Sequence, residues 1–240
     1  MTAKTESGKR LWDGPGETIV TRWWLVRHAP VDPAMKGRLY GQMDIECDVS
    51  DAASFAALAA GLPHDARFLV SPLGRTRKTA QAIRDAGHPN GNHDEDPAFL
   101  EQGFGDWQGL TWNEMQARDP DQYVTFWEAP ADNAPPGGES CADLAHRVGA
   151  GIEAWSEQLA GHDVVLVGHA GTVRGALAHA LGLSAERSLA LSVETLSVTR
   201  LDHIKGGILA SHPGSKKAEV AHQSWRIVSV NQPPHALTAP

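Results

Sequence analysis

The chain of 240 residues and 25.7 kDa is long enough for one large domain with a sizeable hydrophobic core. Its formal net charge of −8, without any block of lysine and arginine, argues against a nucleic-acid partner. No apolar run approaches the roughly 18 residues of a membrane helix, and the polar N-terminus lacks the apolar segment of a secretory signal. The two cysteines, Cys47 and Cys141, lie far apart and in no nucleophile motif, so we expect thiols without a catalytic role in a cytoplasmic protein.

The first half of the chain predicts strands that alternate with helices. The run IVTRWWLV is rich in the β-branched and aromatic residues typical of strands. The alanine-rich stretch DAASFAALAAGLP predicts a helix, which Gly61 and Pro63 end. The expected elements, in chain order, are a strand at 19–26, a helix at 51–63, a strand at 66–70, a helix at 75–87, a turn segment at 88–97 and a short extended piece at 98–100.

The second half continues this alternation and closes with two strands. Ser140, with Asp143 three residues later, has the pattern of a capping box at a helix start. Leu144, Val148 and Ile152 then recur at helical spacing, so one face of that helix is expected to pack inward. The expected elements are one or two helices carrying Trp112, Met115, Tyr123 and Trp127, a helix from 140 onward, a buried strand running into a turn at 163–171, a helix at 172–182, and strands at 191–201 and 224–231 with a polar loop between them.

Strands that alternate with helices predict an α/β fold, here a single three-layer α/β/α domain with a mostly parallel sheet. The sequence has no internal repeat and no linker long enough to divide it. We therefore expect one domain over residues 19–240, preceded by a flexible lead-in at residues 1–18.

Polar residues follow three of the predicted strands. Arg27 and His28 follow the first strand, the segment 71–75 with Arg75 follows the second, and His169 follows the late buried one. In open α/β sheets, ligands bind beyond the carboxyl ends of the strands, where the backbone N–H groups of helix starts form an anion site. Guanidinium groups match phosphate oxygens in a bidentate way and keep their charge at any working pH. The sequence therefore predicts a phosphate site.

Each of these residues also has an ordinary structural explanation when taken alone. His28 could be a hydrogen-bonded core histidine at a strand end, Arg75 could lie on a solvated helix face, and His169 could cap a turn. Their occurrence together favours a site. The other ten histidines show no metal-ligand spacing, so we expect neither a metal nor a cofactor.

Four motifs together resemble the histidine phosphatase superfamily, the group that includes cofactor-dependent phosphoglycerate mutase. They are LVRHAPV, SPLGRTRKTA, LEQGFGDWQG and VVLVGHAGTVRG, and the segment WRIVSVNQPPHAL is similar to the family's closing strand. The resemblance covers nearly the whole chain from about Thr18, and it implies a phosphoglycerate mutase-like fold.

The resemblance also implies the roles of five residues. His28 would take the phosphoryl group, Arg27, Arg75 and His169 would bind its oxygens, and Glu101 would give a proton to the leaving alcohol. A phosphohistidine intermediate splits one difficult displacement into two easier ones, and fixed cations stabilise the transferring phosphoryl group without a metal.

The choice of Glu101 as the acid leaves alternatives open. Glu95, Asp96 and Asp106 lie close by in the sequence. Glu101 is preferred because it occupies the family's position before the Phe-Gly-x-Trp-x-Gly run.

The first motif departs from the family's usual Arg-His-Gly, because Ala29 replaces the glycine. Alanine makes positive φ costly, and Pro30 biases Ala29 towards an extended conformation, so we expect a stiff, extended segment that holds His28 in position. Val31 and Ala34 stand where relatives often carry a hydroxyl residue and an asparagine near the phosphate. Together with the missing mutase pattern, these departures favour hydrolysis.

Two further segments, LYGQMDIECDVSD and PPGGESCADLAHRV, look most like bacterial α-ribazole phosphatase. This likeness implies that Arg38, Tyr40, Gln42 and Glu139 line the substrate entrance, with Ala170 also contributing to substrate binding. The expected partner is a small phosphorylated metabolite, with α-ribazole 5′-phosphate from cobalamin assembly as the named candidate.

Two other functions remain open at this point. One is a phosphoglycerate mutase-like transferase, and the other is a catalytically weak phosphate-binding module, which the Ala29 substitution suggests. The sequence leaves the oligomeric state open.

Overall fold

The computed structural model describes residues 18–89, 92–206 and 223–237, in which six strands form one mixed sheet of order β3-β2-β4-β1-β5-β6. The strands are β1 (Ile19–Arg27), β2 (Arg67–Val70), β3 (His93–Glu95), β4 (Asp163–Gly168), β5 (Val198–Lys205) and β6 (Gln223–Gln232). The first four strands of the sheet order are parallel to one another, whereas β5 runs antiparallel to both β1 and β6. The predicted α/β fold with a mostly parallel sheet is confirmed.

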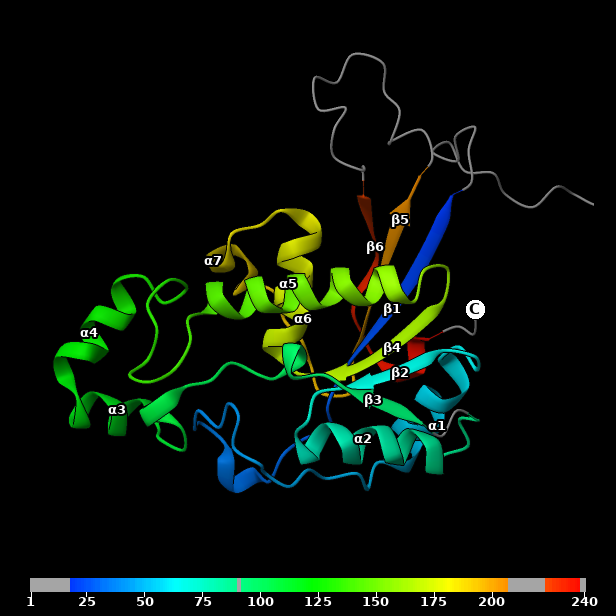
Figure 1. Cartoon of the computed structure of the whole chain (residues 1–240). Coiled ribbons are helices and arrows are strands. Elements are labelled where there is room, and N and C mark those ends of the chain that lie inside the picture. The colour runs from blue at the N-terminus through cyan, green and yellow to red at the C-terminus, as the bar shows by residue number, and fades with distance from the viewer. Residues whose placement is uncertain (1–17, 90–91, 207–222, 238–240) are drawn as a thin grey trace, which may run out of the picture.

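Helices cover both faces of this sheet (Figure 1). The helices are α1 (Ala52–Gly61), α2 (Gly74–Asp85), α3 (Trp112–Arg118), α4 (Pro120–Glu128), α5 (Cys141–Gln158), α6 (Ala170–Leu181) and α7 (Ala185–Ser188), with short 3-10 turns η1 (Pro33–Met35), η2 (Pro97–Phe99), η3 (Gly105–Trp107) and η5 (Pro234–Ala236). Helices α1 and α2 lie on one face, α5 and α6 lie on the other, and α3 and α4 project to one side. None of the helices within the described ranges is long and apolar enough to cross a membrane.

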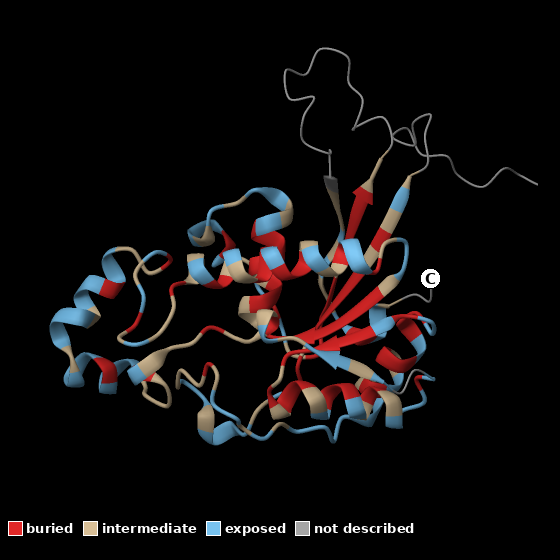
Figure 2. Cartoon of the chain, viewed as in Figure 1, coloured by how far each residue is buried: buried red, intermediate tan, exposed pale blue. Residues whose placement is uncertain are grey.

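Two hydrophobic cores lie on opposite faces of the sheet because successive strand residues point to opposite sides. Leu25 and Leu166 pack with the buried face of α5 and α6, whereas Val26, Val165 and Val167 pack towards α1 and α2. Figure 2 shows this burial along the central strands and the inward helix faces. The near-continuous apolar runs of β1 and β4 thus follow from burial on both faces.

The predicted start of α5 is confirmed in detail. The Ser140 hydroxyl accepts the backbone N–H of Asp143, and the Asp143 carboxylate accepts the backbone N–H of Ser140. This reciprocal pair satisfies two amide groups at the helix start that would otherwise lack partners.

Two expectations for residues 88–100 are wrong. The segment expected to be entirely turn contains β3, which pairs with Phe68–Val70 at the sheet edge, where polar side chains are tolerated. The piece expected to be extended at 98–100 instead holds η2, whose first turn is capped by Asp96. Residues 90–91 lie outside the described residues.

The strand expected at 191–201 begins only at Val198. Leu196 has a positive φ of 61°, which a strand does not tolerate, so the preceding residues form a loop. The expected N-terminal lead-in lies outside the described residues except for Thr18, and so does most of the polar loop between the last two strands.

Candidate active site

The pairing of β1 with β4 brings two of the predicted motifs together. Arg27 lies opposite Gly168 in the parallel register, and the backbone N–H of His28 donates to the Gly168 carbonyl at 2.9 Å. The next residue on each strand is therefore a histidine, and the rings of His28 and His169 lie 5.2 Å apart between centroids, both fully buried.

The hydrogen bond of His28 determines its tautomer. Its Nδ1 lies 2.7 Å from the Ala29 carbonyl oxygen, which can only accept, so Nδ1 carries the proton and Nε2 keeps a lone pair. Burial, with the positive charges of Arg75 and Arg27, lowers the pKa of His28 from 6.5 to about 3. His28 is therefore a neutral imidazole at physiological pH, the form that can act as a nucleophile.

Arg75 enters the same cluster from the first turn of α2. Its side chain is completely buried, donates to the carbonyls of Gly41 at 2.6 Å and Met43 at 2.8 Å, and lies over the ring of Tyr40. Burial lowers the pKa of Arg75 and the Glu101 carboxylate opposes this shift, so the guanidinium stays charged. A buried cation is thus held by neutral carbonyl groups.

His169 stands at the start of α6, and its Nε2 lies 2.6 Å from the Ser71 hydroxyl. When Ser71 donates to Nε2, the proton of the neutral ring is on Nδ1. Burial, with the neighbouring His28 and the charge of Arg75, holds the pKa of His169 well below its ordinary value.

Three buried nitrogens of this cluster have no hydrogen-bond partner among the described residues. They are Nε of Arg27, Nε of Arg75 and Nδ1 of His169. A buried donor without a partner costs about 1–3 kcal/mol, so such groups are rare and require an explanation. A tetrahedral anion would accept from all three side chains, which makes this cluster a candidate phosphate site.

Glu101 lies at the edge of the cluster, against the first turn of α6. Its carboxylate accepts the backbone N–H of Gly171 at 3.1 and 3.3 Å and that of Gln102 at 3.0 Å. A Cβ atom at position 171 would lie 2.1 Å from Glu101 Oε1, so only glycine permits this approach. The start of a helix also favours a carboxylate.

Two of the alternative acids are engaged elsewhere. Glu95 pairs with Arg77 at the surface, and Asp96 accepts from the backbone of Ala98 and the indole N–H of Trp155. Glu101, by contrast, accepts the backbone N–H of Gly171 at the start of α6, and this hydrogen bond holds its carboxylate near His169.

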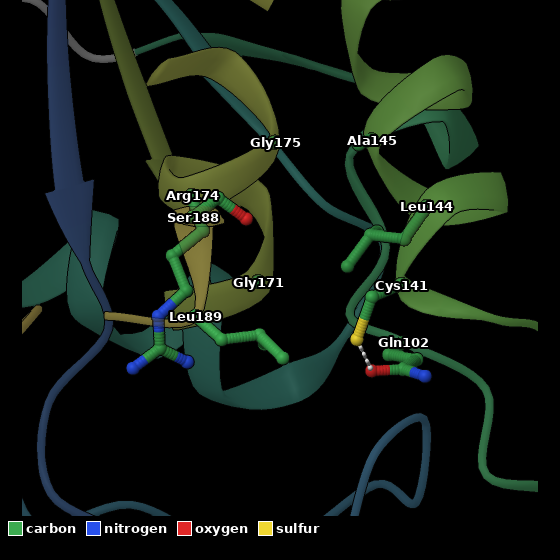
Figure 3. A pocket seen from close by; sticks show the side chains of 9 residues that line it. All are labelled: Gln102, Cys141, Leu144, Ala145, Gly171, Arg174, Gly175, Ser188 and Leu189. Carbon is green, nitrogen blue, oxygen red and sulfur yellow. Dashed lines mark hydrogen bonds between the residues drawn. The ribbon is translucent and has the colours of Figure 1, made fainter. Parts of the chain in front are cut away.

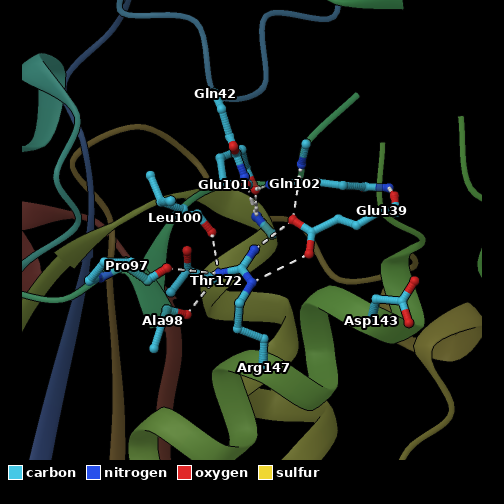
Figure 4. A network of polar contacts seen from close by, with 12 residues as sticks. Gln42, Pro97, Ala98, Leu100, Glu101, Gln102, Glu139, Asp143, Arg147 and Thr172 are labelled. Carbon is cyan, nitrogen blue, oxygen red and sulfur yellow. Dashed lines mark hydrogen bonds and ion pairs between the residues drawn. The ribbon is translucent and has the colours of Figure 1, made fainter. Parts of the chain in front are cut away.

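A brace of polar contacts holds the segment that carries Glu101 (Figure 4). Arg147, on α5, donates to the carbonyls of Ala98 at 2.8 Å and Leu100 at 3.1 Å. It also binds the Glu139 carboxylate at 2.6 Å, and that carboxylate accepts the Gly103 N–H at 3.0 Å. The brace thus fixes the chain on both sides of Glu101. Sequence reasoning missed Arg147, since one arginine on an amphipathic helix gives no signal of this role.

The structure distributes the predicted entrance residues between the cluster and its surroundings. Tyr40 stacks on Arg75, Gln42 donates to the Glu101 carbonyl at 2.9 Å, and Ala170 is the first residue of α6. The carboxylate of Glu139 belongs to the brace. Arg38 donates to Glu114 at 2.9 Å near the start of α3. Their contribution to substrate binding stays a prediction.

The backbone of Ala29 has no positive φ, as its replacement of glycine predicts. Its N–H donates to Thr79 at 2.9 Å, and Val31 pairs with Cys47 in an isolated bridge. Sequence reasoning did not identify Thr79 as this anchor. The extended conformation of the segment stays a prediction.

Comparisons with known proteins agree with this geometry. The sequence model of the histidine phosphatase superfamily (branch 1) matches residues 23–214. Over 180 residues the chain is 30% identical to the 2,3-bisphosphoglycerate-dependent phosphoglycerate mutase of Mesorhizobium japonicum, covering 71% of this chain and 86% of that one. Over 176 residues it is 33% identical to the glucosyl-3-phosphoglycerate phosphatase of Mycolicibacterium vanbaalenii, covering 68% and 76%.

A solved structure shares the fold at lower identity. The α-ribazole phosphatase from Shigella flexneri superposes with a TM-score of 0.68, at 19% identity over 88% of this chain and 97% of that one. At this identity the likeness shows the fold alone.

The low pKa of His28 predicts a pH dependence of stability. The pKa of His28 is about 3 in the folded protein and 6.5 in the unfolded chain. As the pH falls, the unfolded chain therefore binds a proton at His28 before the folded protein does. The free energy of unfolding therefore decreases between these values, by about 2 kcal/mol at about pH 5 relative to about pH 8. Urea unfolding of wild type and His28→Gln at both pH values measures this difference, and an equal decrease in both proteins would contradict the assignment.

The brace predicts strong coupling between Arg147 and Glu139. Arg147→Met leaves a partly buried carboxylate without its cation and should lower the free energy of unfolding by about 2 kcal/mol. The double variant Arg147→Met/Glu139→Gln should lose much less unfolding free energy than the sum of the losses in the two single variants. Urea unfolding of the four proteins in this cycle gives the coupling energy, with Arg67→Met as an exposed control; strictly additive effects would rule out the brace.

Proposed function

Because the chain belongs to the histidine phosphatase superfamily (branch 1), as its four motifs predicted, we propose that it is a metal-independent phosphomonoester hydrolase. The observation that carries this proposal is the neutral His28 beside three buried nitrogens that lack a partner in the described structure. A phosphate there would satisfy the nitrogens and bring its phosphorus to the lone pair of His28 Nε2.

In the first step, Nε2 of His28 attacks phosphorus in line while the bond to the leaving oxygen breaks. Arg27, Arg75 and His169 stabilise the charge on the three equatorial oxygens. Glu101, as the acid, gives its proton to the leaving oxygen. The Ala29 carbonyl keeps the ring oriented through Nδ1.

In the second step, the Glu101 carboxylate takes a proton from a water molecule, whose oxygen forms a bond to phosphorus. The P–N bond breaks, its electron pair returns to Nε2, and inorganic phosphate leaves. Glu101 thus acts as the acid in the first step, in its protonated form, and as the base in the second step, in its ionised form.

A phosphoglycerate mutase-like transfer is the second candidate, because a mutase is among the relatives. A mutase must protect its phosphoryl group from water and return it to the product. The hydrophobic Val31 and the small Ala34 replace groups that would hold the ligand near the phosphate, which favours hydrolysis. Incorporation of ¹⁸O from water into released phosphate separates the two reactions.

The substrate proposal begins from a small phosphorylated metabolite. The relatives with 30% and 33% identity are named for phosphoglycerate and for glucosyl-3-phosphoglycerate, both esters of a hydroxy acid. α-Ribazole 5′-phosphate, the candidate from the sequence, rests on two segments and on a likeness at the level of the fold. We therefore place phosphorylated hydroxy acids first and α-ribazole 5′-phosphate second.

Replacement of His28 tests the nucleophile. His28→Ala should lower phosphate release from phosphoglycerates, α-ribazole 5′-phosphate, sugar phosphates and an aryl phosphate by about 10³-fold or more, because it removes the attacking atom. The exposed His162→Ala is the matched control. A variant that retains an appreciable rate would remove His28 as nucleophile, and tight phosphate binding by a wild type without turnover would favour a binding module.

Replacement of Glu101 tests the acid. Glu101→Gln should lower the rate on alkyl phosphates by about 10²–10⁴-fold, with a much smaller loss on an aryl phosphate, whose leaving group hardly needs a proton. Single-turnover rates of alcohol release, which report the first step alone, provide the measurement on both classes of ester. Equal losses on the two classes would assign the acid to another residue.

A further inference from the structure

A small pocket lies between α5, α6 and α7 (Figure 3). Gly171 is one of its lining residues, and the same glycine holds the Glu101 carboxylate through its backbone N–H. Since Glu101 would protonate the leaving oxygen, the pocket lies on the side where the alcohol part of a substrate would continue.

Most polar groups that line this pocket are already satisfied. The Cys141 thiol donates to the Gln102 side-chain carbonyl, the Gln102 amide donates to the Glu139 carbonyl, and the Ser188 hydroxyl donates to the Ala185 carbonyl. These bonds leave few groups in the lining for a ligand.

Arg174 is the exception in this lining. Its Nε donates to the Leu191 carbonyl at 2.9 Å, and its two terminal nitrogens have no hydrogen-bond partner among the described residues. No carboxylate of the described chain lies within ion-pair distance of it, in contrast to Arg147, which Glu139 neutralises. The pocket thus contains a guanidinium whose charge and outer donors are available.

The direction of the Arg174 side chain brings this charge towards the site. Side chains of an α-helix point towards its N-terminus, so a long side chain covers the turn before its own Cα. Arg174 follows Gly171 by three residues, which places both on one face of α6. Figure 3 shows the side chain running along α6 towards the level of Gly171.

One loop holds both Arg174 and the phosphate site. The Leu191 carbonyl accepts from Arg174, and the Val193 carbonyl, two residues later, accepts from Arg27. The two guanidinium groups are therefore fixed to the same short segment. Arg27 lies at the candidate phosphate site, and Arg174 lies in the pocket where the alcohol part of a substrate would continue.

We propose that Arg174 binds a carboxylate of the substrate, so that the enzyme selects phosphomonoesters whose alcohol part carries a carboxylate near the ester. The planar guanidinium end matches a carboxylate in a bidentate pair. This inference rests on the proposed function, and it assigns a specificity-determining residue to the same site.

The matched pair of 3-phosphoglycerate and glycerol 3-phosphate tests this assignment, because the second has a hydroxymethyl group in place of the carboxylate. Wild type should prefer 3-phosphoglycerate in kcat/KM. Arg174→Met should lower kcat/KM for 3-phosphoglycerate by about 10- to 100-fold, mainly through KM, with much smaller losses on glycerol 3-phosphate and p-nitrophenyl phosphate. Arg174→Lys should keep part of the preference, because its charge is retained without the planar fork.

Controls separate this role from a structural one. Arg118→Met changes an exposed arginine that also donates to a backbone carbonyl and should keep the wild-type preference. Equal losses on both substrates in Arg174→Met would show that Arg174 only positions the loop at Leu191. A wild type without preference between the two substrates would also overturn the proposal.

A measurement without turnover keeps the two proposals distinguishable. Titration calorimetry with 3-phosphoglycerate and glycerol 3-phosphate is done in the His28→Ala background, which lacks the nucleophile. His28→Ala should prefer 3-phosphoglycerate, and His28→Ala/Arg174→Met should have lost this preference. If no ester is hydrolysed, the proposed function fails, and this calorimetric preference alone decides the role of Arg174. Equal affinities of His28→Ala for both ligands would then reject it.

Discussion

Parallel pairing of β1 with β4 is the constraint on which the site depends. It sets Arg27 opposite Gly168, so that His28 and His169 lie together at the carboxyl ends of the two strands. Both strands are buried on both faces, so their register is strongly determined by the two cores. A slip of one residue would turn the apolar side chains to the wrong face and separate the histidines. The core therefore determines the geometry of the site.

The arginines of the site are oriented mainly by backbone carbonyls. Arg27 and Arg174 donate to carbonyl oxygens of the segment 191–193, and Arg75 donates to those of the segment 41–43; these contacts fix the guanidinium planes but do not neutralise their charge. Arg147, by contrast, binds the Glu139 carboxylate and serves as a brace. This division leaves positive potential where an anion would bind, inside a chain whose net charge is −8. Loops, rather than acidic partners, thus prepare the site.

The sequence predicted β1 and β4 from their apolar runs, which are buried on both faces, and α5 from the helical spacing of its apolar residues. It also indicated Arg27, His28, Arg75 and His169, because three of the motifs follow strands or start helices, whereas Glu101 came from the family resemblance. It missed Arg147, Thr79 and Arg174, whose partners are distant backbone groups that leave no local pattern. It misjudged β3 because a polar edge strand has the composition of a turn. Contacts between loops were the part that only the folded chain could show.

The most direct test of the account is to trap the covalent intermediate. Wild type mixed with an aryl phosphate and denatured in alkali within one turnover should carry a single added phosphoryl group, which peptide mass spectrometry should locate on His28. His28→Ala should carry none, and Glu101→Gln should accumulate it, since the water that attacks it lacks its base. A phosphoryl group on another residue, or rapid turnover without any phosphoenzyme, would contradict the central role of His28.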